Sequence, residues 1–312
     1  AIDEVLSAAD VVCSTNSTAG SDLLGGHTFD TLVIDEATQA TAPSCWIPMT
    51  HAHRAILVGD HKQLPPTILN PDAAENGLQY TLFERLAHHH ETDPEAPDSI
   101  RSLLRTQYRM HETIMGFSSR TFYDGRLQAA DAVRRHTLAD LGVSSDALPN
   151  DARRDILAPE APLVFVDTVG LNAPERQRSG SHSRENPREA DLVARLVTDL
   201  LEADVNPAQI AVISPYDDQV DRINEQIEAD EIEVDTVDGF QGREKEVVLI
   251  SLVRSNQNGE IGFLDEPRRF NVAVTRARRK AVIIGNANTV TTGDVFESFV
   301  RYAGTAGRHV RF

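Results

Sequence analysis

The chain has 312 residues, enough for about two domains of ~100–200 residues and for a sizeable core. Its formal net charge is −18, from 48 acidic and 30 basic residues, and three of the basic residues are lysines. No run of ~18 apolar residues and no opening signal-like segment occurs, so we expect no membrane partner. Because the first residue is Ala1 and not Met, we expect a fragment or a processed chain.

The cysteine content and the charge both bear on the compartment. Cys13 and Cys45 do not form a CxxC pair, which argues against a disulfide framework or a zinc site and favours a reducing cytoplasm. An acidic, lysine-poor surface is typical of a salt-adapted, halophilic cytoplasm, where dense carboxylates keep proteins in solution.

The negative charge argues against nucleic acid as a partner only if it is applied to the whole surface, because a binding groove is local. The basic residues gather late in the chain, at Arg243, Lys245, Arg268, Arg269, Arg276, Arg278, Arg279 and Lys280. High salt weakens affinity for phosphates. A nucleic-acid groove should therefore rely on backbone amides, hydroxyls and stacking as well as on charge.

Short apolar segments alternate with amphipathic ones in the first part of the chain. We expect helices at 2–9, 78–89 and 112–123, and strands at 11–14, 31–34, 54–58 and 100–104. The segment 15–26 is rich in Ser, Thr and Gly, whose hydroxyl and backbone NH groups suit phosphates. A flexible surface loop explains that segment equally well.

The same alternation continues after a polar connection within or just before 125–159. We expect strands at 163–166, 210–213, 234–237, 247–253 and 281–285, and helices at 188–203, from 216 to about 229, at 268–277 and at 295–302. This pattern predicts an α/β fold with two doubly wound parallel sheets. We place the domains at 1–124 and 125–312.

Two adjacent carboxylates, Asp35 and Glu36, follow the strand at 31–34. Ligands of open α/β sheets bind outside the carboxyl ends of the strands. There the first carboxylate can hold Mg²⁺, and the second can orient or deprotonate an attacking water. Gln63, in the loop after the strand at 54–58, could hydrogen-bond a terminal phosphate and that water. An isolated acidic pair would be read as a surface turn, but the residues at 37–40 and the later motifs favour the catalytic interpretation.

Two further segments carry groups suited to a nucleotide. Tyr108 could stack on a nucleobase, and Arg109 beside it could make bidentate contacts to phosphate. The loop 238–245 contains two glycines, which allow the backbone to approach a ligand closely.

Five motifs in order resemble those of superfamily 1 helicases of the up-frameshift-like group, in particular the immunoglobulin mu-binding protein 2 subfamily. VIDEATQA (33–40) is similar to motif II and GDHKQLPPT (59–67) to motif III. RTQYRMH (105–111) resembles the motif that contacts adenine and phosphate, VDGFQGREKE (237–246) motif V, and FNVAVTRARR (270–279) motif VI. The resemblance extends from about residue 11 to 286 and implies two RecA-like domains.

The resemblance also implies roles for the matching residues. Asp35 would hold Mg²⁺, Glu36 would activate the water and Gln63 would sense the γ-phosphate of ATP. Arg109 and Arg276 would clamp that phosphate and stabilise the charge of the transition state. For the remaining residues, the resemblance implies that the adenosine is contacted by Tyr108, Glu244 and Gly242 and the nucleic-acid backbone by Thr15, Ser214 and Thr236.

The sequence departs from the family in one respect, because it contains no GxxxxGK[ST] phosphate loop. In the family this loop precedes the point at which the chain begins. We therefore expect the first domain to be truncated at its N-terminus and this polypeptide alone to have negligible ATPase activity.

The favoured hypothesis is a monomeric motor that uses ATP and Mg²⁺ to move 5′→3′ along single-stranded nucleic acid. One alternative is a non-hydrolysing nucleic-acid-binding or regulatory module that lost its phosphate loop. A GxxGxGK[ST] motif upstream of Ala1 in the reading frame would discriminate against this alternative. Another is the helicase half of a nuclease–helicase. Because these motifs read backbone and stacking more than base identity, the sequence leaves DNA and RNA both open.

Overall fold

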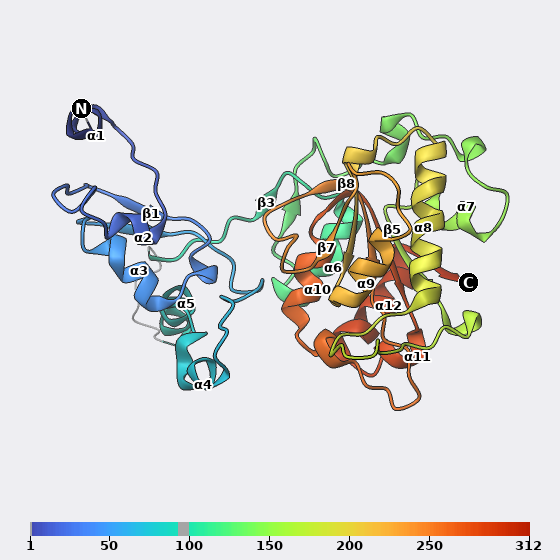
Figure 1. Ribbon diagram of the computed structural model, residues 1–312. Helices are drawn as coiled ribbons and strands as arrows, with labels where there is room; N and C mark the ends of the chain where they lie inside the picture. Colours follow the sequence, from blue (N-terminus) through green and yellow to red (C-terminus); the bar gives the residue numbers. More distant parts are fainter. Residues whose placement is uncertain (1, 93–99) are drawn as a thin grey trace. The chain divides into compact units, whose positions relative to one another are not determined.

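The computed structural model describes residues 2–92 and 100–312 (Figure 1). The chain divides into two compact units, Ala1–Leu103 and Leu104–Phe312, which we describe separately. The division falls before the RTQYRMH segment and not after residue 124. The following helix, α6 (Glu112–Phe122), contacts the large sheet and two helices of the second unit.

The first unit contains a small parallel sheet of two strands, β1 (Leu32–Ile34) and β2 (Ala55–Leu57), with Val33 opposite Ile56. Its core joins Ile34, Ala37, Cys45 and Leu82. The helices are α1 (Ile2–Ala8), α2 (Asn16–Ala19), η1 (Ala37–Gln39), α3 (Ala42–Met49), α4 (Pro71–Ala73), η2 (Ala74–Leu78) and α5 (Leu82–Thr92).

Two expected strands are wrong, because neither 11–14 nor 100–104 pairs with another strand among the described residues. Apolar and β-branched residues favour an extended chain, but a strand also needs a neighbour for its NH and CO groups. A short parallel pair forms instead just after the second segment, between β3 (Thr106–Gln107) and β4 (Gln128–Ala129).

The second unit is built on a six-stranded sheet in the order β10-β5-β9-β8-β6-β7, with every neighbouring pair parallel. The strands are β5 (Leu163–Asp167), β6 (Ile210–Ser214), β7 (Glu233–Thr236), β8 (Lys245–Ser251), β9 (Ala277–Gly285) and β10 (Arg308–Arg311). This confirms the expected α/β fold with a parallel sheet.

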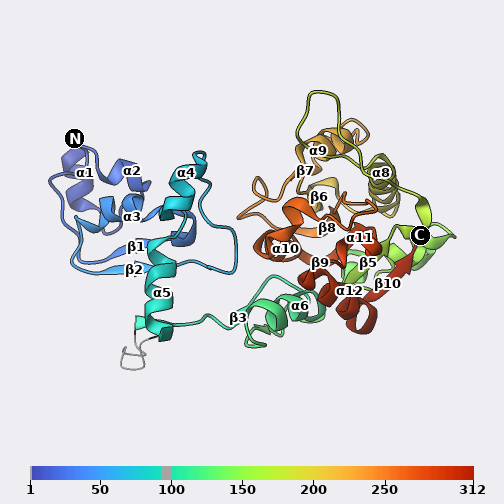
Figure 2. The same cartoon turned by 90° about the horizontal axis from the view of Figure 1, so that it is seen from below.

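Helices cover both faces of this sheet, as in a doubly wound fold (Figure 2). On one face α8 (Pro187–Glu202) buries Leu192, Leu196 and Leu200 against the sheet, and α9 (Asp217–Asn224) lies beside it. On the other face Phe299 of α12 (Asp294–Ala306) packs edge-on against Phe165 of β5. The same ring contacts α6 and α10 (Pro267–Val274). The unit also contains the α-helices α7 (Ala152–Leu157) and α11 (Ala287–Val290) and several short 3-10 turns.

Two boundaries near the end of the chain differ from expectation. The helix expected at 268–277 ends at Val274, because Ala277 already pairs with Lys245 as the start of β9. β10 was not expected, since its sequence RHVR is mostly polar. It is an edge strand, paired only with β5, and such strands need little apolar surface. No helix in the described part of the chain is long and apolar enough to cross a membrane.

Candidate nucleotide and nucleic-acid sites

The two carboxylates of the first unit lie in a turn at the carboxyl end of β1. Glu36 has a φ of +51°, in the left-handed region that is strained for a residue other than glycine. The turn is held on both sides, since Val58 N donates to Ile34 O at 2.9 Å and Ala37 N donates to Val58 O at 2.8 Å. Both carboxylates are exposed, and Asp35 accepts a bond from the Glu36 amide at 2.9 Å.

Side chains from motifs II and III fasten this turn to the next loop. Thr38 accepts a bond from the Asp60 amide at 3.3 Å, and Asp60 in turn accepts one from Gln63 Nε2 at 2.8 Å. Gln39 donates to Glu36 at 2.7 Å and so orients that carboxylate. The structure therefore brings the loops of Asp35, Glu36 and Gln63 together. Sequence reasoning missed Thr38, Gln39 and Asp60 as positioning residues, although all three stand inside the quoted motifs.

In the second unit, Arg109 and Glu244 form an ion pair between segments that are far apart in the sequence. Arg109 Nη1 also donates to Thr275 O at 3.2 Å, in motif VI. Gln107 shapes the turn before it, since its side-chain oxygen accepts bonds from the Arg109 and Met110 amides at 2.8 and 2.7 Å. The structure thus brings three of the expected motifs into one cluster.

Two carboxylates and three guanidinium groups alternate across that cluster. Glu244 accepts from Arg109 and, at 3.1 Å, from Arg278. Glu246 pairs with Arg278 at 3.2 Å and with Arg279 at 2.7 Å. Arg279 also pairs with Asp140 at 3.1 Å, so the three arginines are balanced by three carboxylates. Tyr108, next to Arg109 in the sequence, is 71% exposed and available for stacking.

Arg276 is almost fully buried, at 3% exposed. Its guanidinium donates to Val272 O at 3.0 Å and to the Thr275 hydroxyl at 3.1 Å, and it reaches Arg243 O in the motif V loop at 3.4 Å. In that loop Gly242 has a φ of +80°, and an added Cβ would meet no atom within 4 Å. Gly242 is therefore required by the backbone conformation and not by crowding.

The three hydroxyl residues expected at nucleic acid lie in different settings. Ser214 and Thr236 are partners in register at the carboxyl ends of β6 and β7. Thr236 accepts a bond from Gly239 N at 3.1 Å. The Ser214 hydroxyl is buried and has no hydrogen-bond partner among the residues that the structure describes. Thr15 belongs to the first unit, where it is exposed and caps α2 by accepting from Thr18 N at 3.2 Å.

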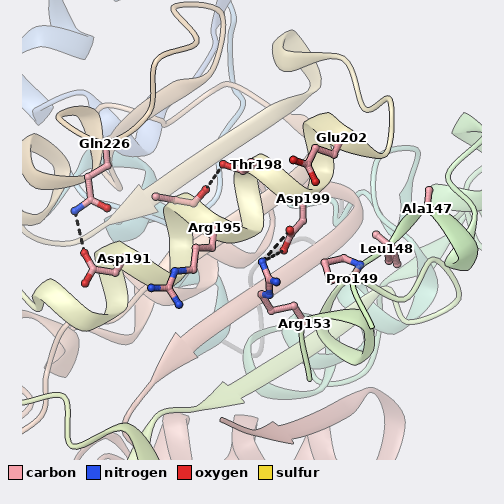
Figure 3. Close-up of a pocket in the computed structure, with 11 residues that line it drawn as sticks. Ala147, Leu148, Pro149, Arg153, Asp191, Arg195, Thr198, Asp199, Glu202 and Gln226 are labelled. Atoms are coloured by element: carbon pink, nitrogen blue, oxygen red, sulfur yellow. Dashed lines mark hydrogen bonds and ion pairs between the residues drawn. The ribbon is translucent and has the colours of Figure 1, made fainter. Parts of the chain in front are cut away.

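A pocket of about 660 Å³ lies away from all of these residues, on the outer side of α8 (Figure 3). Arg153 and Asp199 form an ion pair of 2.9 Å in its wall, and Gln226 donates to Asp191 at 3.2 Å. None of the expected site residues lines it. The residues expected at the site lie instead at strand ends and in the motif loops.

Comparison with known proteins agrees with this arrangement of motifs. Two AAA domain families match the chain, one over residues 78–288 and the other over residues 1–71. The DNA-binding protein SMUBP-2 of Rattus norvegicus is 43% identical over 309 residues, which are 97% of this chain and 30% of that protein. An uncharacterized ATP-dependent helicase of Methanocaldococcus jannaschii is 42% identical over 304 residues, 97% of this chain and 42% of that protein.

A homologue of regulator of nonsense transcripts 1 from Neurospora crassa is 42% identical over 294 residues, 91% of this chain and 25% of that protein. The chain thus spans less than half the length of each of these relatives. The matched regions contain all five motifs, and the chain belongs to the AAA domain family, among the superfamily 1 helicases that include SMUBP-2 and the regulators of nonsense transcripts.

Proposed function

We propose that this chain forms part of an ATP-dependent motor that moves along single-stranded nucleic acid and separates duplexes. The observation that carries the proposal is the pairing of motifs II and III in the first unit, which holds Glu36 and Gln63 on neighbouring loops at strand ends. The relative from Methanocaldococcus jannaschii, named an ATP-dependent helicase, supports the same reading.

Asp35 fits a magnesium ion that is also held by phosphate and water. One of its oxygens accepts the Glu36 amide, and the other has no hydrogen-bond partner among the described residues. The described residues contain no cluster of three His, Cys, Asp or Glu side chains that could hold a metal by themselves. A single carboxylate suits Mg²⁺, which keeps several waters and substrate phosphates as ligands. When bound, the ion neutralises charge on the phosphates.

Glu36 is placed to accept a proton from the attacking water. Its strained backbone and the bond from Gln39 hold the carboxylate in one orientation, so little freedom is lost when the water is bound. Gln63, held by Asp60, would donate to the γ-phosphate or orient the same water. The two side chains divide proton acceptance and positioning between them.

Arg109 and Arg276 would supply positive charge to the phosphoryl group in the transition state. Arg276 is held by three oxygen acceptors, which fixes its direction before the nucleotide binds. Arg109 and Glu244 neutralise each other in this structure, so contacts to phosphate and ribose require that this pair exchange partners. Tyr108 would stack on the adenine and Gly242 would let the backbone approach the nucleotide.

Thr15, Ser214 and Thr236 would contact the backbone of single-stranded DNA or RNA. Thr236 supports this role best, because it lies at the carboxyl end of β7 and is only partly buried. Direct contact by Ser214 would require its strand end to become accessible, since the hydroxyl is buried. We further propose that the protein is monomeric and works in a reducing, salt-rich cytoplasm. The free thiols of Cys13 and Cys45 support the reducing compartment, and the charge of −18 supports the high salt.

The proposal is tested on the protein expressed from its complete reading frame. ATP hydrolysis is measured with and without single-stranded DNA or RNA, and strand separation is measured on duplexes with a 5′ or a 3′ tail. We expect hydrolysis to be stimulated by one of the single strands and unwinding to prefer the 5′ tail. Hydrolysis that ignores both nucleic acids, with no strand separation, would contradict the proposal.

A further inference from the structure

Phe263 stands apart from the other phenylalanines of the chain. All eleven lie in the described part of the structure, and Phe263 is the only one of them that is exposed, with 57% of its surface accessible. It lies in the short helix η8 (Gly262–Asp265), between β8 and α10. Its neighbour Leu264 is buried, at 6% exposed. The turn is therefore anchored by the leucine and presents the phenylalanine outward.

The buried side chain of Arg254 supports the turn that carries Phe263. Arg254 is 4% exposed, pairs with the buried carboxylate of Glu175 at 2.9 Å and donates to the Tyr216 hydroxyl at 3.3 Å. Gly262 has a φ of +56°, and an added Cβ would lie 2.0 Å from Arg254 Nη1. Only glycine allows the turn to close over this guanidinium. A ring on such a support loses little conformational entropy when it stacks on a ligand.

Two contacts connect Phe263 to the strand ends proposed to bind nucleic acid. The ring of Tyr216, two residues after Ser214, lies 5.6 Å from that of Phe263 at an angle of 51°. The guanidinium of Arg269 lies 5.7 Å from the Phe263 ring centre and 3.6 Å from the carboxylate of Asp238, two residues after Thr236. An exposed ring with a cation beside it thus lies next to the carboxyl ends of β6 and β7.

We propose that Phe263 is a stacking platform for a base of single-stranded nucleic acid. Arg269 would contact the adjoining phosphate in exchange for its contact with Asp238. The inference rests on the proposed function and adds a binding residue to it. Stacking on an aromatic ring is tolerant of base identity and independent of charge. It therefore suits a protein with a net charge of −18, whose surface gives little general attraction to phosphates.

The first test compares binding of a fluorescent single-stranded oligonucleotide with binding of an abasic strand of the same length, at low salt, by fluorescence anisotropy. Each stacked base is worth about 1–3 kcal/mol, so Phe263→Ala should weaken binding of the normal strand by about 5- to 150-fold. The loss on the abasic strand should be much smaller. Phe263→Tyr should bind like the wild type. Val169→Ala serves as the control, since it shortens another exposed apolar side chain of the same unit.

A second measurement follows the ring itself. Phe263→Trp is made in a Trp46→Phe background, which removes the protein's one native tryptophan. Addition of the normal strand should quench its fluorescence, and the abasic strand should not.

The outcomes separate the inference from the proposed function. If Phe263→Ala binds the normal strand as well as the wild type, or loses the same factor on both strands, stacking by Phe263 is refuted while nucleic-acid binding stands. If the wild type binds neither strand, the proposed partner fails and the inference with it. If Phe263→Ala instead abolishes a concentration-dependent dimer in sedimentation and leaves binding unchanged, the ring serves a second copy of the chain and the inference is overturned.

Discussion

Glu189 offers a direct test of the buried network that supports the end of β8. Its side chain is fully buried, and one oxygen accepts bonds from the Ser251 hydroxyl at 2.7 Å and from Val253 N at 2.9 Å. Val253 has a φ of +69°, strained for a β-branched residue. The carboxylate therefore holds the backbone in place immediately before Arg254 and the turn that carries Phe263. The change we consider is Glu189→Gln, which keeps the shape and removes the titration.

Burial raises the pKa of Glu189 from its ordinary value of 4.5 to about 7, against the bonds from Ser251 and Val253, which lower it. Between these two pKa values the folded protein keeps a proton that the unfolded chain has lost. The stability contributed by this group is therefore fully present below about pH 4.5 and is lost as the pH rises through 7. In this range the unfolding free energy falls by about 1.4 kcal/mol per pH unit, which amounts to about 3 kcal/mol between the two pKa values.

The assay is urea unfolding at pH 5 and pH 8, followed by far-UV circular dichroism for the large sheet and its helices. Trp46 fluorescence reports separately on the first unit. The unfolding free energy of Glu189→Gln minus that of wild type should increase by about 3 kcal/mol from pH 5 to pH 8. Glu202→Gln, an exposed carboxylate on the same helix, is the control. A difference between wild type and Glu189→Gln that is the same at both pH values would refute the reasoning.

Three further changes test other parts of the account. Burial lowers the pKa of Lys280 to about 7. The stability contributed by the neutral side chain is therefore fully present above pH ~10.4 and is lost as the pH falls through 7. The unfolding free energy of wild type relative to Lys280→Met should therefore fall by about 1.4 kcal/mol per pH unit from pH 10 to 7 in urea titrations, and a flat difference would contradict this. Gly262→Ala should cost about 1–3 kcal/mol in thermal unfolding, because of its positive φ and the contact with Arg254, and an unchanged melting temperature would disprove that. Glu244→Gln should change stability by less than about 1 kcal/mol, since its pair with Arg109 is partly exposed, but should weaken binding of an ATP analogue by the protein from the complete reading frame about tenfold. Unchanged nucleotide affinity would count against a ribose contact by Glu244.

Much of the second unit was predictable from the sequence because its strands are continuous apolar runs. The five expected segments all form parallel strands, from β5 to β9. Four of them, β5, β6, β8 and β9, are largely buried between helices, whereas β7 lies at the sheet edge and is only partly buried. The edge strand β10 was not predicted, because a strand that pairs on one side only does not need an apolar sequence. In the first unit, the segment 11–14 has the composition of a strand but no partner in the described structure, which no local pattern can reveal.

The candidate site was predictable as a set of residues but not as a set of contacts. Asp35, Glu36 and Gln63 follow from strand ends and motif order. The bond from the Asp60 amide to Thr38, which joins their loops, depends instead on the parallel pairing of β1 with β2. The ion pair of Arg109 with Glu244 joins residues 135 positions apart, and local spacing carries no information about it.

We propose above all that Glu36 accepts the proton of the attacking water during ATP hydrolysis. Its most direct test is the ATPase rate of Glu36→Gln, made in the protein from the complete reading frame and measured with single-stranded nucleic acid present. Loss of a general base typically lowers turnover by about 10²–10⁴-fold, and binding of ATP and of the oligonucleotide should be retained. Glu202→Gln should hydrolyse ATP at the wild-type rate. A Glu36→Gln variant that keeps wild-type turnover would contradict the account.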